Sequence, residues 1–348
     1  MRVLAAMSGG VDSSVAAALL VDEGHDVTGV TLRLWAGAAA DSGCCSVAEI
    51  DDARRVASQI GIDHLVWTFT DEFEAQVVAP YVADHAVGRT PNPCIECNRH
   101  LKFGKLLRRA TALGFDAVAT GHHARVEHGH PGRGTHRLLR GADRAKDQSY
   151  VLYVLGQAEL GRTLFPVGHL TKTQVRARAA DLGLVTADKP DSQDVCFVTT
   201  SGGRRSFLAP RTELHPGRVV DRAGEVLGRV DAVELVTVGQ RRGLGTGGGP
   251  RRYALSVDPA TATVVAGVES DLLTDRVTLA HTSWVAEPPA DGGEMEAQWT
   301  AHGRPVAVSL EGRTVHFAEP QRRVAPGQSV VLYRDVEVLG GGIADGKP

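Results

Sequence analysis

The first 200 residues alternate short apolar runs with longer segments in which apolar residues recur every three or four positions. Such runs predict buried parallel strands, and the longer segments predict helices. Capping boxes mark two helix starts, Ser46 with Glu49 and Thr171 with Gln174, and one helical stretch is expected to break at Pro80. The pattern predicts a parallel sheet with helices on both faces. Its expected strands cover 3–7, 27–35, 64–68 and 117–120.

The pattern changes near residue 200. The sequence becomes rich in glycine and carries short Val-rich alternating runs, such as "GRVVDRAGEVLGRV" and "QSVVLYRDVEVLGGGIA". Alternation of this kind predicts the half-buried strands of small β domains. We therefore expect an α/β catalytic domain over 1–199, a small β domain over 200–268 and a β-barrel-like domain over 269–348.

Composition narrows the class of protein. A chain of 348 residues with 43% hydrophobic and 23% charged residues is too long for one ordinary core and too apolar for a disordered chain. Its net charge of −3 excludes nucleic-acid binding by overall basicity, so a polyanion would need a local basic patch. No apolar run approaches the roughly 20 residues of a membrane span, and we expect no membrane association and a cytoplasmic location.

The number and spacing of the cysteines favour reactive or metal-binding thiols over structural disulfides. They form neither an even nor a dense set, which indicates reactive thiols or a metal site rather than structural disulfides. The five are Cys44, Cys45, Cys94, Cys97 and Cys196.

The stretch "AMSGGVDSSVAAALL", residues 6–20, is the first candidate for chemistry. A strand that ends in Ser-Gly-Gly and leads into a helix exposes backbone N–H groups at a positive dipole end, which favours an anion. Hydroxyls of Ser8, Ser13 and Ser14 add donors, and Asp12 is a candidate ligand for Mg²⁺ beside phosphate. The loop lacks the lysine of a Walker A motif and the G-x-G-x-x-G of a dinucleotide site. The alternative is a glycine-rich turn with no ligand.

This stretch resembles the loop of the PP-loop ATP pyrophosphatases. The resemblance implies that the loop holds the β and γ phosphates of ATP, with the adenine side near Leu32 and Gly121. The implied ATP-binding residues are Ala6, Met7, Ser8, Gly9, Gly10, Val11, Asp12, Ser13, Leu32 and Gly121.

Further motifs follow along the whole chain, among them "GRTPNPCIECNRHLKFG", "ATGHHAR", "KDQSYVLY", "FPVGHLTKTQVR", "DSQDVCFV" and "TVGQRRGLG". Together they resemble the bacterial tRNA-specific 2-thiouridylase family. The resemblance implies that ATP adenylates the wobble uridine of a tRNA and that sulfur from a persulfide then displaces AMP. It also implies a sulfur-relay persulfide donor protein or a cysteine desulfurase as partner.

Two thiols are the catalytic candidates. The resemblance implies that Cys196 receives sulfur as a persulfide and that Cys97 is its partner. Release of the outer sulfur as sulfide requires two electrons, which a second thiolate supplies by forming a disulfide. Cys94 stands where the family has an Asp that helps proton transfer, so that role does not carry over and Cys94 is alternatively a second nucleophile.

Metal sites are the alternatives for these thiols. Cys44, Cys45, Cys94 and Cys97 are a candidate Zn²⁺ set, although adjacent cysteines are awkward ligands. Cys94, Cys97 and Cys196 are a candidate set for a [4Fe–4S] cluster. Two other functions stay open as well: a PP-loop enzyme that forms an amide or C–N bond, and a non-catalytic RNA-binding or zinc module.

A basic strip follows the cysteine loop. Residues 98–109 contain Arg99, Lys102, Lys105 and Arg109 on one expected helical face, which favours a phosphate backbone. The resemblance implies contacts with the anticodon arm. The implied tRNA-binding residues are Asn92, Pro93, Cys94, His122, Lys146, Asp147, Gln148, Gln298, Trp299 and Gln328, of which Gln298 and Trp299 replace the family's usual Arg-Tyr pair.

Overall fold

The computed structural model describes residues 1–35, 46–129, 135–191, 195–198, 202–247 and 249–346. Its first part is a five-stranded parallel sheet in the order β3-β2-β1-β4-β7. The strands are β1 (Arg2–Ala6), β2 (Asp26–Arg33), β3 (Asp63–Thr68), β4 (Ala117–Thr120) and β7 (Thr163–Leu164). Within the described residues, no helix combines the length and apolarity that crossing a membrane requires.

Both faces of this sheet are buried, because successive side chains of a strand point to opposite faces. Val3, Ala5 and Met7 pack against one helical layer, whereas Leu4 packs with the aromatic side chains of the other. The first layer contains α1 (Val11–Asp22), α2 (Val47–Gln59) and α8 (Lys172–Asp181). The second contains α3 (Thr70–Phe73), η1 (Glu74–Val78), α4 (Ala79–Ala86), η2 (Cys97–Lys105) and α6 (Leu106–Ala112). The short helix α5 (Pro93–Glu96) leads into η2 and packs Ile95 in a separate cluster with Tyr150 and Tyr153.

The helix across Pro80 does not break, contrary to the sequence prediction. Residues 70–86 are helical throughout, and Pro80 is the second residue of α4. The π-helical turn η1 comes directly before α4. Since proline lacks the N–H that an α-helical ladder needs, the wider π turn absorbs the missing hydrogen bond and the helix continues.

Two β regions follow the parallel sheet, as the sequence predicts. The first is a four-stranded sheet in the order β10-β11-β8-β9, reached through α9 (Gly203–Leu208). The second is an antiparallel sheet in which β12 pairs with both β15 and β17, so that six strands close into a barrel. The strands are β8 (Gly217–Val220), β9 (Val226–Val230), β10 (Tyr253–Asp258), β11 (Thr263–Gly267), β12 (Leu273–Trp284), β13 (Met295–Gln298), β14 (Val306–Glu311), β15 (Thr314–Arg322), β16 (Ser329–Arg334) and β17 (Glu337–Ala344).

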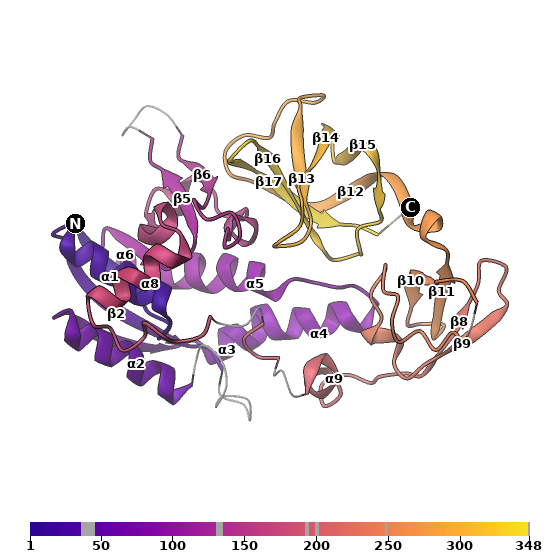
Figure 1. Ribbon diagram of the computed structural model, residues 1–348, viewed down its shortest axis with the longest axis horizontal. Helices are drawn as coiled ribbons and strands as arrows, with labels where there is room; N and C mark the ends of the chain where they lie inside the picture. Colours follow the sequence, from indigo (N-terminus) through magenta and orange to yellow (C-terminus); the bar gives the residue numbers. More distant parts are fainter. Residues whose placement is uncertain (36–45, 130–134, 192–194, 199–201, 248, 347–348) are drawn as a thin grey trace.

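One hairpin from the first part of the chain joins the sheet formed by the last part. Strands β5 (Ala124–Glu127) and β6 (Arg137–Arg140) pair with one another, and β6 pairs antiparallel with β17. Short helices follow the hairpin and lead to α8: η3 (Ser149–Leu152), α7 (Gln157–Leu160) and η4 (Pro166–His169). The remaining ones are η5 (Val233–Leu235) and η6 (Glu269–Leu272). Figure 1 shows α4 and α5 extending from the parallel sheet toward the two β regions.

Candidate functional site

The candidate nucleotide crevice lies at the carboxyl ends of β1 and β4, where the order of the sheet reverses. Residues 7–10 lead from β1 into α1, and Gly121 follows β4. A Cβ at Gly121 would lie 2.5 Å from the backbone nitrogen of Ser13. Gly9 has a φ of +75°, and a Cβ there would overlap the carbonyl oxygen of Glu49. Both positions therefore need glycine to bring three backbone segments together.

The serines of the loop fix its shape. The Ser13 and Ser14 hydroxyls both donate to the Gly10 carbonyl, at 3.0 and 2.9 Å, and the Ser8 N–H donates to Ser13 Oγ at 3.1 Å. These hydroxyls are thus engaged with the loop itself. The donors left for an anion are the backbone N–H groups at the start of α1.

A charge network surrounds Asp12, in the first turn of α1. Lys172 Nζ donates to both carboxylate oxygens, at 2.7 and 2.8 Å, and His123 Nε2 lies 3.1 Å from Oδ1. Burial would raise the pKa of Asp12, but the hydrogen bonds with His123 and Lys172 outweigh it and hold that pKa below its ordinary value. A carboxylate in this position fits Mg²⁺ that is held mainly by substrate phosphates.

The network extends to Lys189, which sequence reasoning missed, and to Lys146, which it assigned only to tRNA binding. Asp191 accepts from Lys146 at 2.7 Å and lies 2.9 Å from Lys172 Nζ. Burial would raise the pKa of Asp191, but these lysines hold it far below its ordinary value. Lys189 Nζ donates to the Gly9 carbonyl at 2.9 Å. The only sequence signal for these partners is that a loop carboxylate needs a cation once it is buried.

The other residues predicted to bind ATP lie at the same edge of the parallel sheet. Ala6 ends β1, positions 7–13 lie in the loop or the first turn of α1, and Val11 is buried. Leu32 is buried near the end of β2 and belongs to the aromatic cluster of the second helical layer. Ala6, at the end of β1, packs against the same cluster, so the candidate crevice borders it.

The two candidate thiols meet this aromatic cluster from distant parts of the chain. Cys97 begins η2, is 8% exposed and belongs to the cluster, and Cys196 packs against it. Cys196 lies in a turn in which the Val198 N–H donates to the Val195 carbonyl at 3.2 Å. The next residue, Phe197, packs its ring on Phe73 (5.6 Å between ring centroids), Tyr81 (5.4 Å) and Phe207 (4.7 Å).

The loop before Cys97 is held by a cap and by the barrel. Asn92 Oδ1 accepts the Cys94 N–H at 3.1 Å and caps α5, with the buried Pro93 at its first position. Thr90 donates its N–H to the Pro326 carbonyl at 2.7 Å, and Gln328 Nε2 donates to the Thr90 carbonyl at 2.7 Å. Asn92 and Gln328 thus fix the backbone of the cysteine loop.

His122 is buried beside this region. Its Nδ1 lies 2.6 Å from Thr120 Oγ1, and its ring packs against Phe103 and Phe165. Burial lowers the pKa of His122 well below its ordinary value, and Lys102 adds to the effect. Burial thus favours the neutral imidazole, which can donate or accept a hydrogen bond.

The basic strip is arranged differently from its prediction. Residues 97–105 are π-helical, so the expected α-helical face does not form. Arg99 contacts Glu96 and donates to Ser283 Oγ of β12 at 3.1 Å. Lys105 pairs with Glu72 and lies over the Phe69 ring, while Arg109 lies over Trp67.

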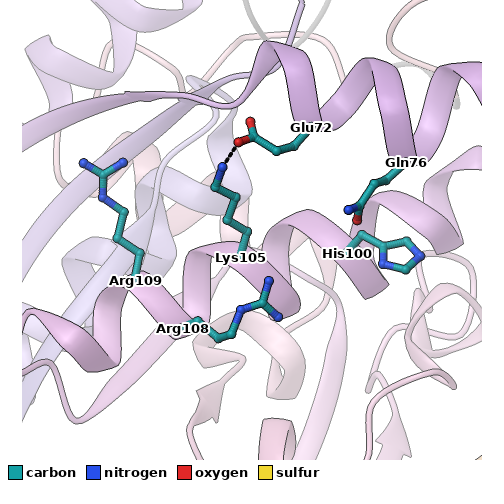
Figure 2. Close-up of a pocket in the computed structure, with 6 residues that line it drawn as sticks. All are labelled: Glu72, Gln76, His100, Lys105, Arg108 and Arg109. Atoms are coloured by element: carbon teal, nitrogen blue, oxygen red, sulfur yellow. Dashed lines mark ion pairs between the residues drawn. The ribbon is translucent and has the colours of Figure 1, made fainter.

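A surface pocket of about 440 Å³ opens beside this helix. Figure 2 shows Lys105 and Glu72 pointing toward one another, with the guanidinium groups of Arg108 and Arg109 on the same helix. Three cations and one carboxylate line the pocket, so it carries a local positive charge on an acidic protein. Its lining residues are Glu72, Gln76, His100, Lys105, Arg108 and Arg109.

The remaining residues predicted to contact tRNA fall into an exposed group and a buried group. Gln148 is exposed, and Lys146 and Trp299 are partly exposed, with the Trp299 ring on Phe317. Asp147 and Gln298 are buried, and both accept hydrogen bonds from Arg140. Contact of these buried side chains with RNA stays a prediction.

The candidate metal sets are only partly described. Cys44 and Cys45 lie outside the described residues, so the predicted Zn²⁺ set is untested. Within the described part of the chain, no three His, Cys, Asp or Glu side chains are grouped so as to hold one metal ion.

Family models match almost the whole chain. Residues 1–200 match the tRNA methyl transferase HUP domain, 205–268 the tRNA methyl transferase PRC-barrel domain, and 274–344 the aminomethyltransferase beta-barrel domain. Solved structures that are similar in part include a 4-thiouridine synthetase–RNA complex with bound ATP (17% identical, 56% of this chain and 44% of that chain, TM-score 0.39). Another is the NMN synthetase of Francisella tularensis (19% identical, 55% and 66%, TM-score 0.33).

Curated relatives match over nearly their full length. The tRNA-specific 2-thiouridylase MnmA of Acidothermus cellulolyticus is 48% identical over 98% of this chain and 96% of that protein. The MnmA of Salinispora arenicola is 50% identical over 96% and 95%. At this identity and coverage, the chain belongs to the tRNA-specific 2-thiouridylase family.

Proposed function

We propose that this protein is an ATP-dependent tRNA 2-thiouridylase, which replaces the 2-carbonyl oxygen of a wobble uridine with sulfur. The observation that carries the proposal is the aromatic cluster beside the nucleotide crevice. It contains Leu32 and Cys97, and Cys196 packs against it. The candidate nucleotide crevice and two thiols from distant parts of the chain therefore border one cluster, which supports activation followed by sulfur transfer.

Activation takes place at the glycine loop. The uridine oxygen attacks the α-phosphate of ATP, an adenylated base forms, and pyrophosphate leaves. The backbone N–H groups of α1 bind the leaving phosphates, whose negative charge the positive end of the helix stabilises. Lys172 and Lys189 already lie at the loop, on Asp12 and on the Gly9 carbonyl, and supply cations to the same phosphates. Mg²⁺ beside Asp12 neutralises further charge on ATP when bound.

Sulfur transfer uses both thiols. A sulfur-relay protein or cysteine desulfurase donates sulfur to Cys196, which becomes a persulfide. The Cys97 thiolate attacks the inner sulfur of that persulfide, so a Cys97–Cys196 disulfide forms and the outer sulfur leaves as hydrosulfide. Hydrosulfide attacks C2 of the adenylated uridine and displaces AMP. A thiol reductant then returns the disulfide to two thiols.

The anticodon arm of tRNA is the proposed macromolecular substrate. Asn92, Pro93, Cys94 and His122 flank the flipped base, and neutral His122 is suited to hydrogen bonding with it. The pocket of Lys105, Arg108 and Arg109 binds backbone phosphates, and we expect it to make tRNA affinity depend on salt. Gln328 supports this surface by holding the cysteine loop on the barrel. Binding of tRNA agrees with a cytoplasmic location, which stays a prediction.

One reaction tests the proposal. The protein is incubated with ATP, Mg²⁺, a persulfide source and unmodified tRNA, and the digested RNA is analysed for 2-thiouridine while pyrophosphate is measured. We expect both products in equal amounts. Pyrophosphate without thiolated uridine would indicate a PP-loop ligase, and neither product would indicate a non-catalytic RNA-binding module. Iron analysis of anaerobically purified protein tests the predicted [4Fe–4S] alternative, which the proposed mechanism does not use.

A further inference from the structure

A buried arginine joins the two stretches that are expected to contact RNA. Arg140 ends β6 and is 4% exposed, and its N–H donates to the Val336 carbonyl beside β17 at 2.8 Å. The hairpin of β5 and β6 comes from the first part of the chain, yet it forms the edge of the barrel sheet. Arg140 therefore stands where the catalytic part of the chain meets the barrel.

One nitrogen of this arginine binds both stretches. Arg140 Nη1 donates to Asp147 Oδ2 at 2.9 Å and to Gln298 Oε1 at 2.9 Å. Asp147 is 5% exposed and Gln298 is 3% exposed. The guanidinium carbon also lies 3.5 Å from the centre of the Tyr333 ring, whose face attracts the cation.

The two partners have their remaining polar groups engaged within the protein. Asp147 Oδ1 accepts the N–H groups of Gly141 and Ser149, and the Ser149 hydroxyl donates to Oδ2. Gln298 Nε2 donates to the carbonyls of Thr300 and Ala301, at 2.8 and 2.9 Å. Neither side chain can turn to RNA without leaving buried polar groups unpaired, which is costly.

The neighbours of these anchors are the residues that solvent reaches. Lys146 and Gln148 flank Asp147 and are partly or fully exposed, and Trp299 follows Gln298 with partial exposure. Gln298 at the end of β13 faces Arg140, whereas Trp299 packs its ring on Phe317 of the barrel cluster and keeps part of its surface exposed.

We propose that Arg140 is a positioning residue for tRNA, which holds residues 146–148 and 298–299 as one surface and acts through Asp147 and Gln298. The inference rests on the proposed function. Asp147 and Gln298 are anchors in this account, whereas Lys146, Gln148 and Trp299 contact the RNA. A buried ion pair contributes little net stability but fixes geometry, which suits such a role.

The test is a double-mutant cycle on tRNA affinity. Gln298→Met cuts the link to the barrel but leaves the Arg140–Asp147 pair. Arg140→Lys keeps the buried charge, but its side chain is one atom shorter than arginine and has no planar group to lie over Tyr333, so Nζ does not take the place of Nη1 between the two partners. Loss of a hydrogen bond to a charged group weakens tRNA binding by about tenfold in each variant. Both substitutions remove the same Arg140–Gln298 link, so the double variant binds tRNA no more weakly than either single variant. The affinity for ATP is unchanged in all three variants.

The matched control is Arg137→Gln, on the same strand. Arg137 also bridges to the barrel, through Glu337 at 2.9 Å, but its side chain is 45% exposed. An exposed pair contributes little, so we expect a change of less than about twofold in tRNA affinity.

Three results would overturn the inference. Additive losses of tRNA affinity in the double variant would mean that Gln298 contacts RNA independently of Arg140. Wild-type tRNA affinity in Arg140→Lys would mean that no positioning occurs, and equal losses of ATP and tRNA affinity would mean that Arg140 only maintains the fold. A wild-type protein that binds no tRNA would instead contradict the proposed function.

Discussion

Replacing Gly121 with alanine tests whether the crevice is built by close backbone contact. The added Cβ would lie 2.5 Å from Ser13 N and 2.7 Å from the carbonyl carbon of Asp12, both backbone atoms that cannot rotate away. The start of α1 must therefore shift by several tenths of an ångström, and overpacking of this kind costs about 1–3 kcal/mol. If ATP binding has to restore the original spacing, this cost corresponds to a loss of ATP affinity of about 5-fold to 150-fold.

The assay is titration of the protein with ATP by calorimetry, together with the KM for ATP in thiolation. The matched control is Gly247→Ala, because Gly247 is exposed and an added Cβ would meet no atom within 4 Å. We expect the control to bind ATP like the wild type and the Gly121 variant to keep its tRNA affinity. Wild-type ATP affinity in Gly121→Ala would refute the assignment of this crevice to ATP.

Three further predictions address the surroundings of the site. Lys172→Met removes the cation that binds Asp12, so we expect an ATP dissociation constant about tenfold higher, measured by calorimetry, with unchanged tRNA binding. Asn92→Ala removes the cap of α5 and should lower kcat for thiolation, whereas Asn92→Ser, which can also cap, should restore most of it. Burial lowers the pKa of His85 to about 4, so the unfolded chain takes up the proton first as pH falls below about 6.5. The free energy of unfolding should therefore fall by about 2 kcal/mol between pH 7 and pH 5, and urea unfolding of His85→Gln should show that much less pH dependence.

Strands and helix caps were predictable wherever a short sequence pattern determines them. The expected strand 3–7 is β1 at Arg2–Ala6, and the expected strand 117–120 is β4 with the same bounds. Ser46 and Thr171 cap α2 and α8 as predicted, because a capping side chain bonds to a backbone group only three residues away. The fold class, a parallel sheet followed by two β regions, is confirmed by the sheet topology.

Long-range partners were not predictable from one sequence. The link from Asp12 to Lys172 spans 160 positions, and no local pattern announces it. The hairpin at 124–140 reads as part of the first domain, yet it pairs with β17 near the end of the chain. Arg140 and Asp147 look like ordinary surface charges until the barrel covers them. In each case, tertiary packing decides the role of the residue.

The proposed sulfur transfer requires Cys97 to supply the electrons that release sulfur from Cys196. It is tested most directly in a single turnover with persulfide-loaded protein, ATP, Mg²⁺ and unmodified tRNA, without reductant. Mass spectrometry of the digested protein quantifies the Cys97–Cys196 disulfide, and analysis of the RNA quantifies 2-thiouridine. We expect one disulfide for each thiolated uridine and neither product in Cys97→Ser. Thiolated uridine without that disulfide, or an equal yield from Cys97→Ser, would contradict it.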